Sequence, residues 1–66
     1  MEVTVNGEKR SFDKPLSVSS LINTLELTEA ATIVEHNGQV LKKSLFSDTL
    51  IGEGDRLELI QLVGGG

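Results

Sequence analysis

The chain has 66 residues, and its ten acidic and six basic side chains give a formal net charge of −4. It contains no cysteine and a single histidine, His36, so zinc sites, iron–sulfur ligation and thiol nucleophiles are excluded. Nucleic acid is disfavoured as a partner, because phosphate contacts need clustered Lys and Arg and base stacking needs more than two aromatic rings.

The length predicts one domain. The apolar runs are far shorter than the roughly 20 residues that cross a bilayer. The N-terminal MEVTVNG also lacks the basic and apolar regions of a signal peptide. We therefore expect a soluble cytoplasmic protein that is monomeric when free, binds no metal or cofactor itself and has no membrane partner.

The first elements predict a hairpin followed by a helix. Residues 2–5 alternate polar and apolar, Asn6-Gly7 is a tight-turn signal, and a second strand runs to Phe12 before Pro15 ends it. The stretch LSVSSLINTLEL then places an apolar stripe at helical spacing. Ser17 is expected to cap this helix of eight to ten residues. The stripe consists of Val18, Leu21, Ile22 and Leu25.

The second half predicts strands and an irregular loop. TIVEH and QVL flank a second Asn-Gly turn at 37–38 and predict another strand pair. The segment KKSLFSDTL has no clean period and predicts a loop or a single helical turn, held to the core by Leu45, Phe46 and Leu50. GEGD predicts a turn, with Asp55 as its polar exit, before the last strand, RLELIQLV.

This order predicts an α+β fold, with one helix packed on one face of a mixed four- to five-stranded sheet. The last strand is the most apolar element, so we expect it at the centre of the sheet, beside the first strand and parallel to it. The folded domain is expected to span residues 1–63, with residues 64–66 as a flexible Gly-Gly-Gly tail.

The last strand carries more apolar surface than one helix can cover. Alternation places Leu57 and Leu59 toward the helix and turns Ile60 and Leu62 to the opposite face. Either a bulge or the irregular loop hides Ile60 and Leu62, or they form an exposed patch of the kind that marks an interaction surface.

The sequence shows no catalytic constellation. His36 precedes a tight turn, a position typical of a solvated strand end and not of a general base. The carboxylates are scattered, and GEGD lacks the Lys-Ser/Thr and the following helix of a phosphate loop. We therefore expect a protein that is not itself an enzyme.

The remaining candidate is the ending LVGGG. Glycine has no Cβ, so residues 64–66 make the slimmest segment a chain can form. Extended, Val63 to Gly66 reach at most about 13–14 Å, enough to present a carboxylate in a narrow tunnel. Fixing such a tail costs about 1–2 kcal/mol per residue, so the body would have to dock as well. The alternative is a frayed end or the remnant of an expression linker.

The order of elements, the turn in EHNGQVL and the ending GEGDRLELIQLVGGG together resemble the ThiS family of sulfur carriers in thiamine biosynthesis, over the whole chain. The resemblance implies a β-grasp, ubiquitin-like fold. It also implies that a ThiF-like enzyme adenylates the Gly66 carboxylate with MgATP. Sulfur that comes ultimately from a cysteine desulfurase would then convert it to a thiocarboxylate, which supplies a ThiG-like thiazole synthase.

In this family the carrier is a substrate of its partner enzymes. Gly66 would carry the chemistry and Gly64 and Gly65 would give a slender approach, with the partner surface formed by Val63, Leu62 and Ile60. Four alternatives stay open: the small subunit of molybdopterin synthase, a carrier for another sulfur recipient, a ubiquitin-like modifier conjugated through Gly66, and a plain interaction module.

Overall fold

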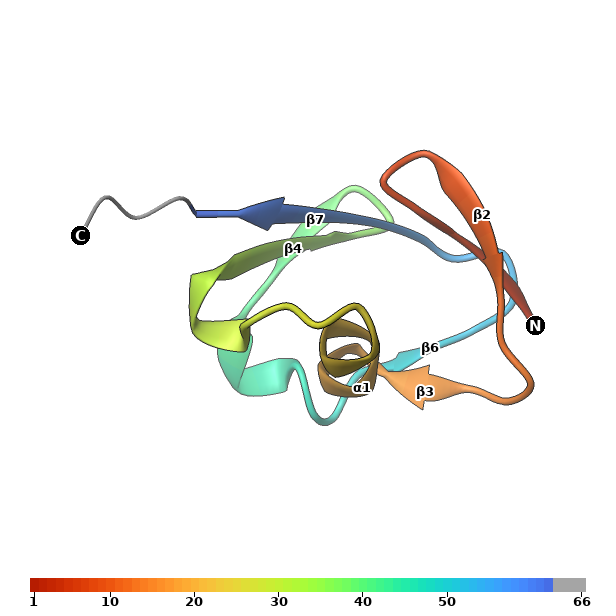
Figure 1. Cartoon of the computed structure of the whole chain (residues 1–66), viewed down its shortest axis with the longest axis horizontal. Helices are drawn as coiled ribbons and strands as arrows, with labels where there is room; N and C mark the ends of the chain where they lie inside the picture. The colour runs from red at the N-terminus through yellow and green to blue at the C-terminus, as the bar shows by residue number, and fades with distance from the viewer. Residues whose placement is uncertain (63–66) are drawn as a thin grey trace.

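The computed structural model describes residues 1–62. A five-stranded sheet has the order β2-β1-β7-β4-β5, and β3 and β6 form a separate two-stranded sheet. Strand β7 lies at the centre beside β1 and parallel to it, as predicted. On its other side it pairs with β4 in the antiparallel sense (Figure 1). The elements are β1 (Glu2–Val5), β2 (Glu8–Ser11), β3 (Leu16–Ser17), α1 (Val18–Thr24), the 3-10 helix η1 (Glu29–Ala31), β4 (Thr32–His36), β5 (Gln39–Leu41), the 3-10 helix η2 (Lys43–Leu45), β6 (Leu50–Ile51) and β7 (Arg56–Gln61).

Both predicted Asn-Gly turns are confirmed. Asn6 and Gly7 have φ angles of +51° and +81°, and Asn37 and Gly38 have +52° and +88°. Positive φ at both central residues suits the twist of a two-residue hairpin. The first turn also holds the centre of the sheet, because the Asn6 Oδ1 accepts the Leu59 N–H at 2.8 Å.

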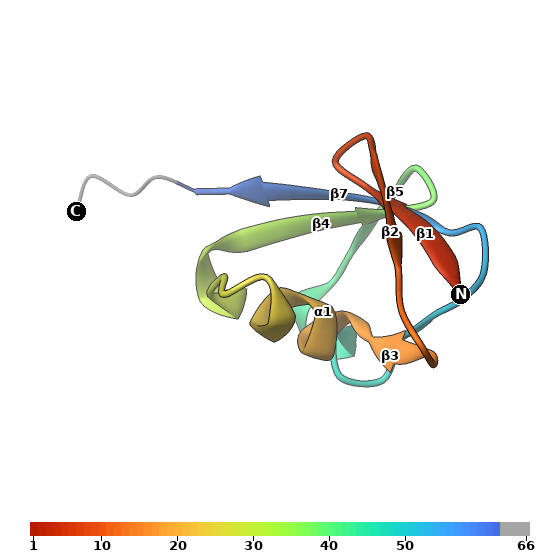
Figure 2. The ribbon, with the colours of Figure 1, turned by 45° about the vertical axis from the view of Figure 1, so that its right-hand side comes forward.

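The helix begins where the sequence predicts. The Ser17 hydroxyl oxygen accepts the Ser20 N–H at 3.0 Å, so Ser17 is the N-cap. The helix has seven residues, slightly fewer than expected, and it covers one face of the sheet (Figure 2).

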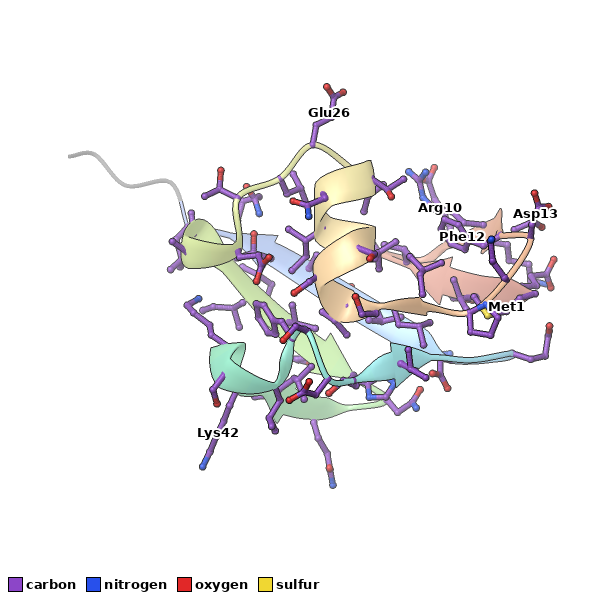
Figure 3. All side chains as sticks on the ribbon, turned by 90° about the horizontal axis from the view of Figure 1, so that it is seen from below. Met1, Arg10, Phe12, Asp13, Glu26 and Lys42 are labelled. Atoms are coloured by element: carbon purple, nitrogen blue, oxygen red, sulfur yellow. The ribbon has the colours of Figure 1, made fainter. Side chains whose placement is uncertain are left out.

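The helix ends at an unusual residue. Leu25 is the C-cap, and Glu26 follows it with a φ of +60°. The Glu26 N–H donates to Asn23 and the Leu27 N–H donates to Ile22, both at 3.0 Å, which is the Schellman pattern. Glycine commonly holds the left-handed position of that motif, and here it is a glutamate that points away from the body (Figure 3).

The core lies between α1 and the sheet. Val18, Leu21 and Ile22 of the helix are fully buried against strand residues. Phe12 packs at the margin of this core and exchanges backbone hydrogen bonds with Met1, at the end of the molecule where Figure 3 labels both. The strand and loop members of the core are Val3, Val5, Val34, Phe46, Ile51, Leu57 and Leu59.

The loop at 42–50 is held differently from the prediction. Phe46 is buried, but Leu45 and Leu50 are 44% and 67% exposed, so the prediction that all three contact the core is wrong. The reason is β6, a strand that was not predicted. It pairs with β3, and alternation in a strand turns Leu50 outward when Ile51 is buried. Ile51 holds the loop in the place of Leu50. The single helical turn expected in this segment is η2.

Candidate functional site

The face of the five-stranded sheet opposite α1, here called the outer face, carries apolar side chains. Ile60 and Leu62 are 46% and 50% exposed. The segment 42–50 cannot cover them, because it lies on the helix side: Val18 N–H donates to Thr49 O, and Ser19 N–H donates to Phe46 O. The alternative in which a bulge or this loop hides the two residues is therefore wrong.

Two further residues extend this surface. Ile33 of β4 lies directly opposite Ile60 in the β4–β7 ladder, and residues opposite each other share a face. Val40 of β5 lies opposite Glu35 on the same face and is 70% exposed. We call Ile33, Val40, Ile60 and Leu62 the outer patch. Ile33 and Val40 were not predicted as site residues, since only the strand register, and not the alternation within one strand, brings them together with Ile60.

The next row of the outer face holds two glutamates, with Val40 at its β5 end. Glu35 and Glu58 lie opposite each other, one row along the strands from Ile33 and Ile60. Together with Arg56 they border a hollow of about 520 Å³, whose lining residues are Glu35, Asn37, Gly38, Gly54, Arg56 and Glu58. The outer face thus joins an apolar patch to a hollow whose charged side chains are two glutamates and one arginine.

Just before β7, Asp55 joins its own turn to the end of β4 and the turn that follows β4. Its Oδ2 accepts the Gly52 N–H at 2.9 Å and lies 3.0 Å from the His36 Nε2, while its Oδ1 accepts from the Asn37 Nδ2 at 3.2 Å. Partial burial acts to raise the pKa of Asp55. The hydrogen bonds from Gly52, His36 and Asn37 outweigh burial and hold this pKa below its ordinary value. Asp55 is therefore a structural anion.

His36 lies at the end of β4, before the tight turn, as predicted, but its surroundings differ from the expectation. Its side chain is partly buried and hydrogen-bonded to Asp55, so the expectation of a solvated strand end is wrong. Within residues 1–62 its side-chain partners are Asp55 and Asn37, and no hydroxyl nucleophile joins them. The two residues are 19 positions apart in the sequence, and His36 meets Asp55 only when β4 and β7 pair, so the contact could not be predicted.

Two hydrogen bonds at the start of β4 hold the end of β7 in place. The Leu62 N–H donates to Ala31 O at 2.7 Å, and the Gln61 Nε2 donates to the Thr32 Oγ1 at 2.6 Å. Gln61 therefore shares the face of Leu57 and Leu59, in keeping with the alternation along β7. The roles predicted for Val63 and for Gly64, Gly65 and Gly66 lie outside the described residues.

Other kinds of site receive no support from the described part of the chain. No group of three His, Asp or Glu side chains in residues 1–62 is arranged to hold a metal ion. Over the same residues, no helix has the length and hydropathy to cross a membrane.

Comparison with known proteins agrees with this architecture. A thiamine biosynthesis protein (ThiS) from Geobacter metallireducens has a crystal structure that superposes with a TM-score of 0.84, at 36% identity and with full coverage of both chains. Superposition on the solution structure of a thiamine biosynthesis protein from the same organism gives a TM-score of 0.81, with all of this chain matched to 88% of that chain. The fold is thus the predicted β-grasp, with one helix on a mixed five-stranded sheet.

The sequence relatives point the same way. The chain is 36% identical to the uncharacterized protein ycf40 of Pyropia yezoensis, of which it covers 93%. It is 32% identical to a thiazole synthase of Paramagnetospirillum magneticum but spans only 20% of the length of that protein. The model of the ThiS family matches residues 3–66. With that match over nearly all of its length, the chain belongs to the ThiS family.

Proposed function

We propose that this chain is a sulfur carrier for thiazole formation in thiamine biosynthesis, with Gly66 as the carrying residue. The observation that carries the proposal is the family match, which extends through the glycine ending to residue 66. The similarity to a thiazole synthase supports thiazole as the product to which the sulfur goes. Under this proposal the chain is a co-substrate, and its partner enzymes catalyse the reactions.

The proposed chemistry has two steps at one carboxyl group, the first at its oxygen and the second at its carbon. A carboxylate oxygen of Gly66 attacks the α-phosphorus of ATP, held with Mg²⁺ by a ThiF-like enzyme, and pyrophosphate leaves. A sulfide-level nucleophile then attacks the acyl carbon, AMP leaves with the original carboxylate oxygen, and a thiocarboxylate remains. In the cell the sulfur would come ultimately from a cysteine desulfurase, and a ThiG-like enzyme would accept it.

The geometry supports separate roles for the folded body, which would dock on the partner, and the C-terminal segment, which would enter the active site. Ile60 and Leu62 of the outer patch lie at the end of β7, next to the segment 63–66. Exposed apolar patches mark interaction surfaces, so we propose this patch as the docking surface for the partner enzymes. Docking the body would offset the conformational entropy lost when Val63, Gly64 and Gly65 are ordered in a narrow site.

The direct test uses purified protein, a ThiF-like enzyme, MgATP and hydrosulfide. We expect an increase in intact mass equal to the exchange of one oxygen for sulfur, confined to the C-terminal peptide that ends in Gly66. Deleting Gly65 and Gly66 should abolish the change and leave the melting temperature unaltered, because the core is built from residues 3–59.

Two results would contradict the proposal. One is a wild-type chain that shows no ATP- and sulfide-dependent mass change with an enzyme active on its own carrier. The other is a deletion variant that still supports thiazole formation in cells. Higher-mass conjugates on denaturing gels, formed through Gly66, would favour a ubiquitin-like modifier instead.

A further inference from the structure

The last pair of the β4–β7 ladder, Thr32 opposite Gln61, carries hydrogen bonds beyond those of the strands. The Gln61 Nε2 donates to the Thr32 Oγ1, and that hydroxyl donates to the Thr28 carbonyl, each at 2.6 Å. The Lys43 ammonium donates to the Thr32 carbonyl at 2.9 Å. We call the Thr28–Thr32–Gln61 chain of hydrogen bonds the exit clamp.

Thr32 is an unusual choice for its position. Among residues 1–62 it is the one polar residue whose side chain is fully buried. A buried hydroxyl costs free energy unless it is hydrogen-bonded, whereas valine has nearly the same shape and would bury a methyl group there. Packing alone therefore does not explain the hydroxyl. Its hydrogen bonds do, since they join the turn before β4 to the last residue of β7.

The exit clamp and the outer patch lie on opposite faces of β7. Gln61 reaches toward Thr32 on the helix side, while Ile60 and Leu62 belong to the outer face. The next residue is held by the backbone, because the Leu62 N–H donates to Ala31 O at 2.7 Å. Changes to the exit clamp can thus alter the direction of the chain at residue 62 without touching the docking surface.

We propose that Thr32 and Gln61 are positioning residues for the chemistry at Gly66. This inference rests on the proposed function. A docked body delivers the tail productively only if the root of the tail has a fixed direction, and a misplacement of about 1 Å can cost a large factor in rate. The exit clamp supplies that fixed direction and leaves affinity to the outer patch.

The experiment compares Thr32→Val and Gln61→Met with two controls. Gln61 is exposed, so its variant folds even if Thr32→Val does not. Thr32→Ser keeps the hydroxyl and should therefore keep the wild-type hydrogen exchange at Leu62 and the wild-type kcat. Val34→Ala is the matched control for stability, because it removes buried volume from the same face of β4 without a clamp hydrogen bond.

Two measurements separate positioning from general destabilisation. In the free protein, amide hydrogen exchange at Leu62 should rise about two- to tenfold in the clamp variants, the effect of one lost hydrogen bond, with Leu59 unchanged. In adenylation by a ThiF-like enzyme, kcat should fall about two- to tenfold by the same reasoning, with KM within about twofold of the wild type. Val34→Ala should lower Tm yet keep kcat at temperatures below its melting.

Two outcomes would overturn the inference, and they are distinguishable. If the wild type is adenylated and both clamp variants keep the wild-type kcat, the positioning role of Thr32 and Gln61 is rejected. The proposed function is then unaffected. Absence of adenylation with the wild-type chain rejects the proposed function and this inference with it.

Discussion

Ile33 of β4 and Ile60 of β7 lie opposite each other on the outer face of the sheet, where α1 does not reach. Each belongs to a different part of the chain, and only the antiparallel register brings them together. With Leu62 and Val40 they give the molecule an apolar surface beside an acidic one. Three predictions follow from this surface, from the anchor at Asp55 and from the end of the helix.

Ile60→Glu should weaken binding to the proposed partner, a ThiF-like enzyme, about 10- to 100-fold, the effect of losing an interface anchor worth about 1–3 kcal/mol. Folding should change little, because Ile60 is nearly half exposed. Titration calorimetry with a ThiF-like enzyme measures the first effect and thermal melting the second. Leu50→Glu is the matched control: it adds the same charge at an exposed apolar residue on β6, away from the outer face.

Equal losses of affinity for Ile60→Glu and Leu50→Glu would show that added charge, and not the outer patch, controls binding. Loss of cooperative melting in Ile60→Glu would instead make Ile60 part of the core.

Asp55→Asn should lower the free energy of unfolding at pH 7 by about 1–2 kcal/mol, since the lost hydrogen bonds are made to a charged acceptor that is partly exposed. The pKa of Asp55 is below its ordinary value in the fold. Its stabilisation is therefore complete above the unfolded pKa and disappears as the pH falls through the folded pKa.

Denaturant unfolding at pH 7 and at a series of pH values below 4 checks this expectation. The wild type should lose stability more steeply than Asp55→Asn on the acid side, so the two curves converge as the pH falls. Parallel curves would mean that Asp55 is not a stabilising anion. Asp48→Asn, at an exposed residue, provides the control for removal of one negative charge.

Glu26→Gly should stabilise the protein by about 1 kcal/mol. Glu26 occupies the left-handed region at a φ of +60°, where a side chain costs roughly 1–2 kcal/mol, partly offset by the greater freedom of glycine in the unfolded chain. Thermal or chemical unfolding measures the gain. Glu53→Gly, another exposed glutamate in a turn but without positive φ, should give no gain. A loss of stability in Glu26→Gly would contradict the strain argument.

Local chemistry explains which parts of the fold the sequence predicts. A two-residue hairpin turn requires positive φ at both central residues, and Asn6-Gly7 and Asn37-Gly38 adopt it at low cost, so both hairpins are readable from the sequence. The Ser17 cap needs only the residues that follow it. The boundaries of TIVEH and QVL agree with β4 and β5 residue for residue, because a turn closes one end of each.

The features that were missed depend on distant partners or on broken local rules. The helix end carries Glu26 where glycine would have signalled it. The strands β3 and β6 have two residues each, too few to show a period, and so the outward turn of Leu50 could not be foreseen. The partners of Asp55 and Ile33 follow only from the β4–β7 register.

The central position of β7 also has a consequence for folding. The two hairpins, β1–β2 and β4–β5, are local and can form within microseconds. Joining them requires β7, whose pairing of Arg56 with Thr4 closes a loop over most of the chain. Each hairpin alone displays only part of the outer face. Because Ile33 and Ile60 meet only after β4 and β7 have paired, a partner that binds both residues discriminates against molecules in which this pairing is absent.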